Sequence, residues 1–465
     1  MHRCLIALAL CITATTACSD NPVTIHSPVD DASGILVIAG DAQQGPPSST
    51  LSDAVRFEVV DAAGAPVGGI EVAIDVVTGG GNVTTSDATT GADGIVGTTW
   101  KLGPDPGRQQ IEARVAAKTG LRSTALACAG PCDPVHPLDL VSLVPLSTYE
   151  GSGQAVHPDV VVAPGFTGGY WLAATPYPGG NANFENPSLF QSADAIGWTV
   201  PLGLMNPIDH PANGAYLSDP DIVFNPATNE LWLYYREVAD GANRVRLVRS
   251  ADGVHWSAPT VVASAPSHQI VSPAVVRGSP LGAWAMWSVN SGPAGCDATA
   301  TTVELRTSSD GVHWNAPTAA GLAQPGVNIW HIDVQWLPGR GEYWAVYNTY
   351  AHGGTCTTDA LYMAVSHDGT HWQTFPSPIA RRGVIDALAD IIYRSTFLLD
   401  PAANTVTFWY SGAAYNSGSG YVWRIATVTR RVDDLLAAAA APAATILANP
   451  QRMLPPPEPD VGGGS

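Results

Sequence analysis

The stretch Ser308-Ser-Asp310-Gly-Val-His-Trp314 decides the fold, because close variants of it occur three more times along the chain. The other copies are Ser192-Ala-Asp194-Ala-Ile-Gly-Trp198, Ser250-Ala-Asp252-Gly-Val-His-Trp256 and Ser366-His-Asp368-Gly-Thr-His-Trp372. Each copy begins 58 residues after the previous one. A constant period of this length is typical of propeller blades or of another array of similar units.

The residues between the copies indicate four short strands in each repeat. In the third repeat these are 270–276, 282–288 and 302–307, followed by a strand from Trp314 onward. The segment 139–432 is about five periods long, which predicts a five-bladed β-propeller of four-stranded blades. The fifth repeat lacks the motif, and residues 138–145 are expected to lend it a strand.

The composition supports an all-β protein. Of 465 residues, 47 are Gly and 38 are Pro, while only 13% are charged. This mixture disfavours long solvated helices and favours short strands joined by tight turns. The net charge of −19 argues against nucleic acid or an anionic membrane surface as a partner.

Residues 34–127 predict a separate β-sandwich, because strands such as 55–60 and 70–76 alternate with turns. This segment resembles a group 1 bacterial immunoglobulin-like domain. The resemblance is carried by Asp61-x-x-Gly64-x-Pro66-Val67, Gly79-Gly80-Gly81, Thr90-Gly91-x-x-Gly94, Trp100-x-Leu102-Gly103 and Gly107-x-Gln109. It implies an immunoglobulin-like sandwich that acts as a spacer or adhesion module, without catalytic residues.

Residues 1–18 predict an export signal. The apolar run 4–12 is too short to span a bilayer, and Thr15-Thr-Ala-Cys18 resembles a bacterial lipobox, which implies lipidation of Cys18. Ordinary cleavage near Ala17 is the alternative. Residues 19–33 are interpreted as a tether, 128–138 as a Pro-rich linker and 433–465 as an Ala/Pro/Gly-rich tail. We therefore expect an exported lipoprotein anchored at the cell surface or the periplasmic face.

Four cysteines remain beyond the signal and the anchor, an even number that suits an oxidising compartment. Cys128 and Cys132 are close enough to close a small loop by a disulfide. Cys296 and Cys356 lie in Gly-rich loops and are predicted to be neighbours. A zinc site at Cys128 and Cys132 is the alternative, although no His stands at ligand spacing from them.

The repeated motif is interpreted as structural. It resembles the Asp-box of sialidase-type propellers, which implies a turn at the outer edge of each blade, away from the central channel. In such a turn Asp194, Asp252, Asp310 and Asp368 would accept backbone N–H bonds, and Gly would supply a positive φ. The histidines before the tryptophans, His255, His313 and His371, fall under the same interpretation.

Candidate functional residues stand on the strands expected to line the channel. These strands begin near His157-Pro-Asp159, Ser218-Asp219-Pro-Asp221, Ser272-Pro273, Trp330-His331-Ile-Asp333 and Tyr393-Arg394. Polar side chains there are costly to bury without partners, so we expect them to share one wet pocket and at least one carboxyl pKa to be raised. The alternative is that each carboxylate only binds the backbone of the neighbouring blade.

Five blades with Asp-Pro on inner strands resemble the arabinanase, β-xylosidase and invertase group of glycoside hydrolases. The resemblance implies a catalytic carboxylate at Asp159 and a pKa-tuning carboxylate at Asp219. The acid Glu of that group has no counterpart at Ser272-Pro273. Because glycoside hydrolysis needs two carboxyl groups, we expect Glu185 to serve as the acid, with Glu237 as the alternative.

The sequence therefore predicts an exported glycoside hydrolase-like protein that acts on an extracellular polysaccharide or oligosaccharide. A non-catalytic carbohydrate-binding or adhesion propeller is the alternative. No cofactor and no metal are expected, and the chain is expected to be a monomer. The residues expected to bind the sugar are His157, Asn186, Asp221, Arg236, Trp330, His331, Asp333 and Arg394.

Overall fold

The computed structural model of this chain describes residues 27–40, 43–61, 65–130, 137–138, 141–211, 214–383, 385–416 and 420–441. The expected signal, Cys18, Cys132 and the last part of the tail lie outside these ranges. No helix within them is long and apolar enough to cross a membrane.

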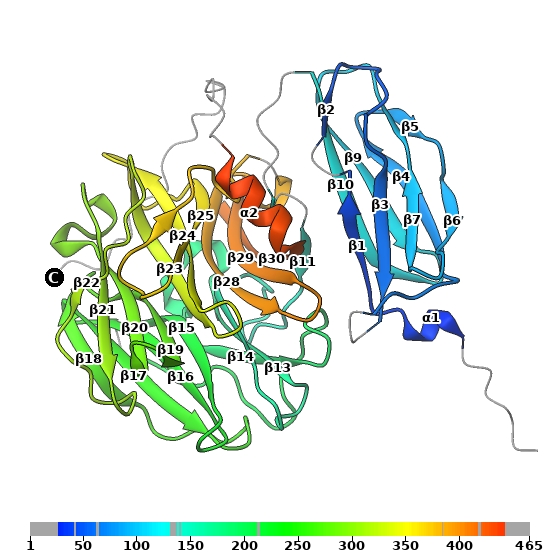
Figure 1. Cartoon of the computed structure of the whole chain (residues 1–465). Coiled ribbons are helices and arrows are strands. Elements are labelled where there is room, and N and C mark those ends of the chain that lie inside the picture. Colours follow the sequence, from blue (N-terminus) through cyan, green and yellow to red (C-terminus); the bar gives the residue numbers. More distant parts are fainter. Residues whose placement is uncertain are drawn as a thin grey trace, which may run out of the picture.

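The N-terminal part is a β-sandwich, drawn in blue to cyan in Figure 1. After the short helix α1 (Pro28–Asp31), its strands form a three-stranded sheet, a five-stranded sheet and a two-stranded ribbon. In order within each sheet they are β1 (Gly34–Ala39), β3 (Val55–Val60) and β7 (Ile95–Thr98); β2 (Gln43–Gly45), β10 (Lys118–Ala129), β9 (Gly107–Val115), β4 (Glu71–Thr78) and β6 (Asp87–Thr89); and β5 (Gly81–Val83) and β8 (Trp100–Leu102). The core between the sheets includes Phe57, Ile74 and Ile111, all fully buried by period-two alternation.

Five antiparallel sheets make up the described part of the chain from β11 to β30. Four of them follow one another along the sequence: β12 (Ala155–Val162), β13 (Tyr170–Pro176) and β14 (Ser188–Ser192); β15 (Tyr216–Asn225), β16 (Glu230–Ala239), β17 (Ala242–Ser250) and β18 (Thr260–Pro266); β19 (Val271–Ser279), β20 (Gly282–Asn290), β21 (Thr302–Ser308) and β22 (Thr318–Ala319); and β23 (Val327–Leu337), β24 (Glu342–Ala351), β25 (Ala360–Ser366) and β26 (Gln373–Thr374), with β27 (Ala380–Arg381) beside β25.

The fifth sheet joins distant parts of the sequence. It contains β28 (Ile391–Asp400), β29 (Thr405–Asn416) and β30 (Gly420–Arg431), and its fourth strand is β11 (Ser142–Val144), which pairs with β30. The expectation that residues 138–145 lend this sheet a strand is confirmed. Helix α2 (Val432–Ala440) follows and buries Leu435 and Ala439 against the same sheet and its neighbour.

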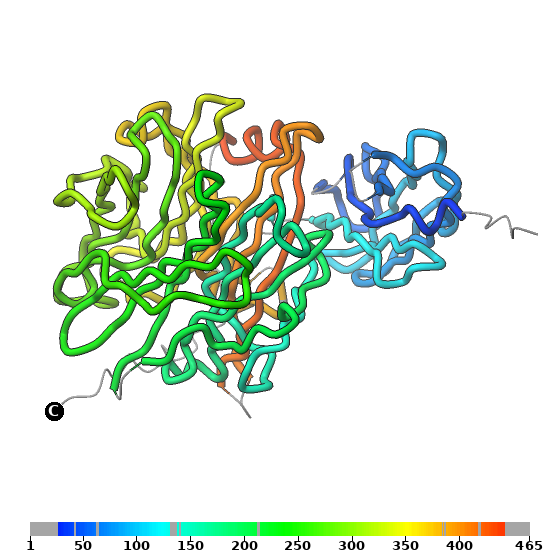
Figure 2. Tube along the Cα trace, turned by 90° about the horizontal axis from the view of Figure 1, so that it is seen from below, coloured from blue at the N-terminus to red at the C-terminus, as the bar shows by residue number. Residues whose placement is uncertain are grey.

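The first strands of the five sheets contact one another in a closed ring: β12 with β15, β15 with β19, β19 with β23, β23 with β28, and β28 with β12. Each neighbouring pair of sheets also shares a hydrophobic core. Trp171 and Leu233, for example, join the first and second sheets, and Trp287 and Tyr347 join the third and fourth. Figure 2 shows these sheets as one rounded body, with the N-terminal sandwich at its side.

The repeated motif forms the turn after the third strand of a sheet, as its structural interpretation requires. Asp310 Oδ1 accepts the N–H groups of Val312 and His313 at 2.9 and 2.8 Å. Gly311 has φ +75°, and its carbonyl accepts the hydroxyl of Tyr234, from the neighbouring sheet, at 2.9 Å. His313 is largely exposed. The motif therefore fixes one sheet against the next, far from the ring of first strands.

Two further features shape the end of the ring where the first strands begin. Four short 3-10 helices, η1 (Pro178–Gly180), η2 (Ala182–Phe184), η3 (Gly292–Asp297) and η4 (Asp386–Leu388), lie in described loops of the five sheets. The disulfide Cys296–Cys356 joins the loop after β20 to the loop after β24, so this predicted pair is confirmed. The pair Cys128–Cys132 stays a prediction, because Cys132 lies outside the described residues.

Every first strand carries a β-bulge at a matching place. The two bulged residues are 157 and 158 in β12, 219 and 220 in β15, 272 and 273 in β19, 330 and 331 in β23, and 393 and 394 in β28. In three strands the first bulged residue has a positive φ, which is 55° for His157, 50° for Asp219 and 53° for Ser272. Non-glycine residues in this region are strained, and such strain clusters at functional sites.

Candidate functional site: two polar groups in the ring of first strands

The first polar group consists of His157, Asp219 and His331, which the bulges of β12, β15 and β23 bring together. Nε2 of His157 lies 3.3 Å from Asp219 Oδ1, and Nδ1 of His331 lies 3.5 Å from the same oxygen. All three side chains are at most 2% exposed. None of these three atoms has a hydrogen-bond partner among the described residues. Ligand atoms of the group lie within 4.8 Å of one another, so they could hold a metal ion.

Surrounding residues fix the orientation of this group. Nδ1 of His157 lies 2.9 Å from the hydroxyl of the buried Thr175 on β13. The other oxygen of Asp219 accepts Nε of Arg236 at 2.9 Å and the backbone N–H of Ser272 at 3.0 Å. Arg236 in turn donates to the hydroxyl of Ser218. Such outer contacts are typical of metal-ligating side chains, whose free atoms they aim at a common point.

The electrostatics leave two neutral imidazoles beside an ionised carboxyl group. Burial lowers the pKa of His157 to about 3 and that of His331 well below its ordinary value. Burial opposes ionisation of Asp219, but Arg236 and then the two histidines hold its pKa below the ordinary value. Neutral imidazole and carboxylate are the forms in which these side chains bind metals.

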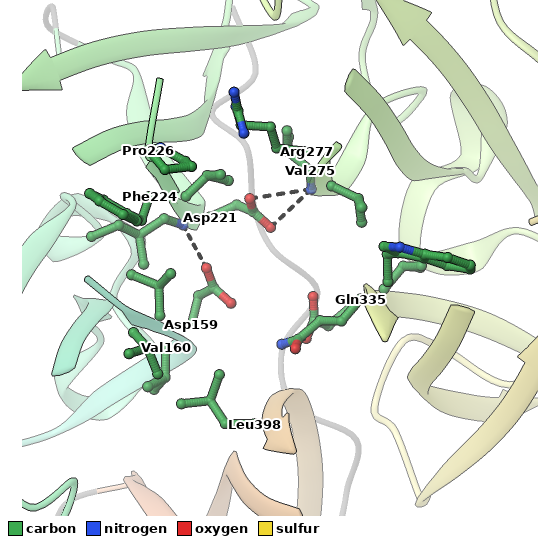
Figure 3. Close-up of a pocket in the computed structure, with 17 residues that line it drawn as sticks. Asp159, Val160, Asp221, Phe224, Pro226, Val275, Arg277, Gln335 and Leu398 are labelled. Atoms are coloured by element: carbon green, nitrogen blue, oxygen red, sulfur yellow. Dashed lines mark hydrogen bonds between the residues drawn. The ribbon is translucent and has the colours of Figure 1, made fainter. Parts of the chain in front are cut away.

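The second polar group consists of Asp159, Asp221 and Asp333, each two residues further along its strand than a member of the first group. All three are nearly fully buried, and their carboxyl oxygens lie within 4.8 Å of one another. They line one end of a cavity of about 350 Å³, whose other walls include Val161, Val276 and Trp336. Figure 3 shows the carboxyl groups of Asp159 and Asp221 pointing into this cavity.

Two carboxylates of this second group, Asp159 and Asp221, bind the backbone of neighbouring sheets, which is the alternative that the sequence left open. Asp159 accepts the N–H of Ile222 at 2.5 Å and the hydroxyl of Thr396 at 2.9 Å. Asp221 accepts the N–H of Val275 at 3.2 Å. These hydrogen bonds tie consecutive first strands together, so the second group has a structural task.

The expected rise of at least one carboxyl pKa is confirmed in the second group. Burial and then the neighbouring Asp333 raise the pKa of Asp159 to about 7, against the opposing influence of Arg394. Burial and Asp159 raise the pKa of Asp221 well above its ordinary value, and burial raises that of Asp333. The guanidinium of Arg394 lies 3.8 Å from Asp221 and acts on both polar groups.

Glu185 and Asn186 lie in the loop between β13 and β14 and are buried. The backbone carbonyl of Glu185 accepts the N–H of Leu217, two residues before Asp219, at 2.9 Å. Burial is the main cause of the raised pKa of Tyr393, and the Glu185 carboxylate adds to it. Glu185 is not among the residues that line the cavity beside Asp159. Asn186 donates to the hydroxyl of Tyr149 at 2.9 Å. Of the predicted site residues, Glu185 therefore belongs with Asp219 rather than with Asp159.

Aromatic side chains pack against the first group, among them Trp330, which the sequence predicts as a sugar-binding residue, and Tyr393, for which it predicts no role. The ring centroid of Tyr393 lies 4.4 Å from the ring centroid of His331 and 5.4 Å from that of His157. Its hydroxyl accepts Nε1 of Trp330 at 3.3 Å, and its ring contacts Trp423 at 5.3 Å. Trp423 in turn contacts Tyr177 at 5.2 Å. The signal available in the sequence was the position of Tyr393 at the start of the fifth inner strand.

The sequence expected one pocket without a metal, and the structure instead arranges the same residues as two groups of three. His157, Asp219 and His331 face one another with free ligand atoms, while Asp159, Asp221 and Asp333 face the cavity. The sequence did contain a signal for the first group, because His157, Asp219 and His331 stand at matching positions of three inner strands. From the sequence, His157 and His331 are predicted to bind sugar rather than metal.

Comparisons with known proteins point to carbohydrate-active enzymes. No protein-family model matches this chain. It is 30% identical to an A type blood N-acetyl-α-D-galactosamine deacetylase of Flavonifractor plautii, over 56% of this chain. The chain spans only 40% of the length of that relative.

A solved structure is similar to the same part of the fold. An N-acetylgalactosamine deacetylase from F. plautii, in complex with blood group B trisaccharide, is 26% identical, with a TM-score of 0.55 over 60% of this chain and 90% of that one. A Bacillus subtilis arabinanase, from the group expected at the outset, is only 13% identical, with a TM-score of 0.39 over 59% of this chain and 94% of that one. That likeness is too remote to carry an argument about activity.

Proposed function

We propose that this chain is a metal-dependent hydrolase that removes the acetyl group from an N-acetylated amino sugar. The observation that carries the proposal is the convergence of Nε2 of His157, Oδ1 of Asp219 and Nδ1 of His331, without hydrogen-bond partners among the described residues. Buried polar atoms without partners are costly, so a ligand is the simplest way to satisfy them. The likeness to a deacetylase supports the same reaction class.

The residues fit a divalent metal ion of the first transition series. Imidazole and carboxylate together suit zinc, iron, nickel or manganese, and three protein ligands leave a coordination position open, as in catalytic sites. When bound, such an ion polarises a carbonyl group and lowers the pKa of water. Thr175 would hold the proton of His157 on Nδ1, which leaves Nε2 as the ligand atom.

The remaining residues near the first group suit the proton transfers and the binding of a sugar. Amide hydrolysis adds water to the acetyl carbonyl, breaks the C–N bond and delivers a proton to the amine. We assign Glu185 as the group that takes the proton from water and gives it to the leaving nitrogen, because it is buried and its backbone is bonded to Leu217, two residues before Asp219. Tyr393, Trp423 and Tyr177 offer aromatic faces for the apolar side of a sugar ring.

Hydrolysis of a glycosidic bond is the second candidate, as the sequence predicted. A carboxyl group with a raised pKa is what a general acid needs, and Asp159 has a pKa of about 7 at the cavity wall. In glycosidases, however, the two carboxyl groups are about 5 to 9.5 Å apart. Asp159 and Asp221 are engaged in hydrogen bonds between strands, one carboxyl oxygen of each of Asp159, Asp221 and Asp333 lies within 4.8 Å of the others, and the expected acid Glu185 does not line their cavity. Amide hydrolysis is therefore preferred.

One assay separates the two reactions. Purified protein is incubated with a panel of N-acetylated and unacetylated oligosaccharides, and both released acetate and new reducing ends are measured. We expect acetate without new reducing ends, and loss of acetate release in Glu185→Gln and Asp219→Asn. Reducing ends that disappear in Asp159→Asn would establish glycoside hydrolysis instead, and binding without either product would support the non-catalytic carbohydrate-binding alternative.

We also propose the finer architecture and the location that the sequence predicted. The five sheets with their ring of first strands support a five-bladed propeller, and the two facing sheets of the N-terminal part support an immunoglobulin-like spacer. Export and lipidation at Cys18 rest on the sequence of residues 1–18 alone. A disulfide between Cys296 and Cys356 suits an oxidising compartment.

A further inference from the structure

The bulge in β23 leaves the backbone of His331 without its ordinary partner in the sheet. The neighbouring pairs of this ladder are Ile329 with Thr349 and Ile332 with Tyr347, so Asn348 alone stands opposite Trp330 and His331. A bulged residue loses its regular ladder bond, and its N–H needs another acceptor. The side chain of Asn348 supplies it, because its Oδ1 accepts the N–H of His331 at 2.6 Å.

The other end of the Asn348 amide is also held. Its Nδ2 donates to the hydroxyl of Thr358 at 3.1 Å, and that hydroxyl donates to the carbonyl of Ile392. The N–H of Ile392 returns to the carbonyl of Thr358 at 3.2 Å. Asn348 and Thr358 are fully buried. A continuous chain of hydrogen bonds thus joins the bulge at His331 to the residue that precedes Tyr393.

The Cys296–Cys356 disulfide lies close in sequence to this chain of hydrogen bonds. Cys356 is two residues before Thr358, and its partner Cys296 lies in η3, two residues before Ala298. The carbonyl of Ala298 accepts Nδ2 of Asn328 and the hydroxyl of Tyr350, each at 3.1 Å. The loop of Cys296 is therefore bonded to β23 and β24, which carry His331 and Asn348, and the loop of Cys356 is bonded to β24 through Asn348.

The ring of His331 has no hydrogen bond of its own to set its direction. Neither of its nitrogens has a hydrogen-bond partner among the described residues, whereas Nδ1 of His157 contacts Thr175. The direction of the His331 ring thus depends on its backbone and on ring contacts with Tyr393 and Trp330, at 4.4 and 5.7 Å. Asn348 fixes that backbone, and Thr358 fixes the strand of Tyr393.

We propose that Asn348, oriented by Thr358 and the Cys296–Cys356 disulfide, is a positioning residue that sets the direction of His331 as a metal ligand. The inference rests on the proposed function and adds to it a hydrogen-bonded support for His331, as Thr175 supports His157. Outer partners of this kind typically change metal affinity by about 10- to 100-fold when they are removed.

The test measures metal binding directly, so it does not depend on finding the substrate. Zinc and manganese are titrated by calorimetry into metal-free wild type, Asn348→Ala, Thr358→Val and Thr358→Ser. We expect the metal Kd to rise about 10- to 100-fold in Asn348→Ala and Thr358→Val, and to stay near the wild-type value in Thr358→Ser, which keeps the hydroxyl. Excess metal should restore any lost turnover.

Tyr347→Phe is the matched control. It removes a hydrogen bond of 2.7 Å between Tyr347 and Gln324, both buried, from the same strand without touching His331. Its thermal stability should fall while its metal Kd stays unchanged. If Asn348→Ala and Thr358→Val bind metal as tightly as Tyr347→Phe, the positioning role is refuted and the proposed function stands. If wild type binds neither metal, the proposed function is refuted and this inference falls with it.

Discussion

The hydroxyl of Thr175 offers a sharp test of the proposed metal site, because it contacts His157 and nothing else that the reaction needs. Its oxygen lies 2.9 Å from Nδ1 of His157, and the side chain is fully buried. Thr175→Val keeps the shape of the side chain and removes the only described acceptor for that ring proton. We expect weaker metal binding with the fold retained.

The magnitude follows from the loss of this outer contact. Without an acceptor at Nδ1, His157 gains other ring orientations and tautomers, and Nε2 is no longer presented to the metal. Such losses typically cost about 10- to 100-fold in affinity, which corresponds to about 1.4 to 2.8 kcal/mol. Leaving a buried N–H without a partner also costs about 1–3 kcal/mol of stability.

The assay is calorimetric titration of metal-free protein with zinc or manganese, together with thermal unfolding of the metal-free and metal-loaded forms. Thr175→Ser, which keeps the hydroxyl, is the matched control and should retain nearly the wild-type Kd. An unchanged Kd in Thr175→Val, with a lowered melting temperature, would show that this contact serves only the fold. Metal would then be bound elsewhere, or not at all.

Four other perturbations have defined outcomes. Chelation should abolish activity and lower the melting temperature, because metal binds only the folded state. Re-addition of metal should restore both. Activity that survives exhaustive chelation would contradict the proposed metal site. Asp219→Asn should lose metal binding and turnover. It also removes the carboxylate that pairs with the buried Arg236, so circular dichroism must accompany the titration to show that the variant is folded. Full turnover in this variant would show that Asp219 is not part of the site. Asp310→Ala should lower thermal stability, because two backbone N–H groups lose their acceptor. Below the temperature of thermal unfolding, kcat and KM should be unchanged. Loss of activity without loss of stability would show that the motif is functional. Cys18→Ser should release the protein from the membrane fraction without changing its activity, whereas a wild type recovered in soluble form would indicate ordinary secretion.

The repeated architecture could be read from the sequence, because its causes are local. Asp310 and Gly311 form their turn with residues two and three positions away, so the motif repeats wherever the local sequence repeats. The alternation of buried and exposed residues likewise predicts strands of a given length. The pairing of Cys296 with Cys356 was predicted from their Gly-rich loops and the strand lent by residues 142–144 from the incomplete fifth repeat, and both are present.

The division of the site depended on tertiary structure. A regular strand advances about 6.6 Å over two residues, and in β12, β15 and β23 a β-bulge at the first of the two positions also changes the direction of the side chains. His157 and Asp159 are therefore near in sequence yet belong to different layers, and each meets its counterparts from other strands. The sequence identified all six of these residues but placed them in one pocket.

The chemistry proposed for each layer was also beyond the sequence, because it depends on which atoms are left without partners. Asp159 and Asp221 are satisfied by the N–H groups of Ile222 and Val275 on neighbouring sheets, and these contacts exist only once the ring of strands closes. His157 and His331 retain free nitrogens because the bulges turn them toward Asp219, away from other acceptors. The sequence thus determined the residue types on each strand, whereas ring closure and the bulges decided which of them can bind a ligand.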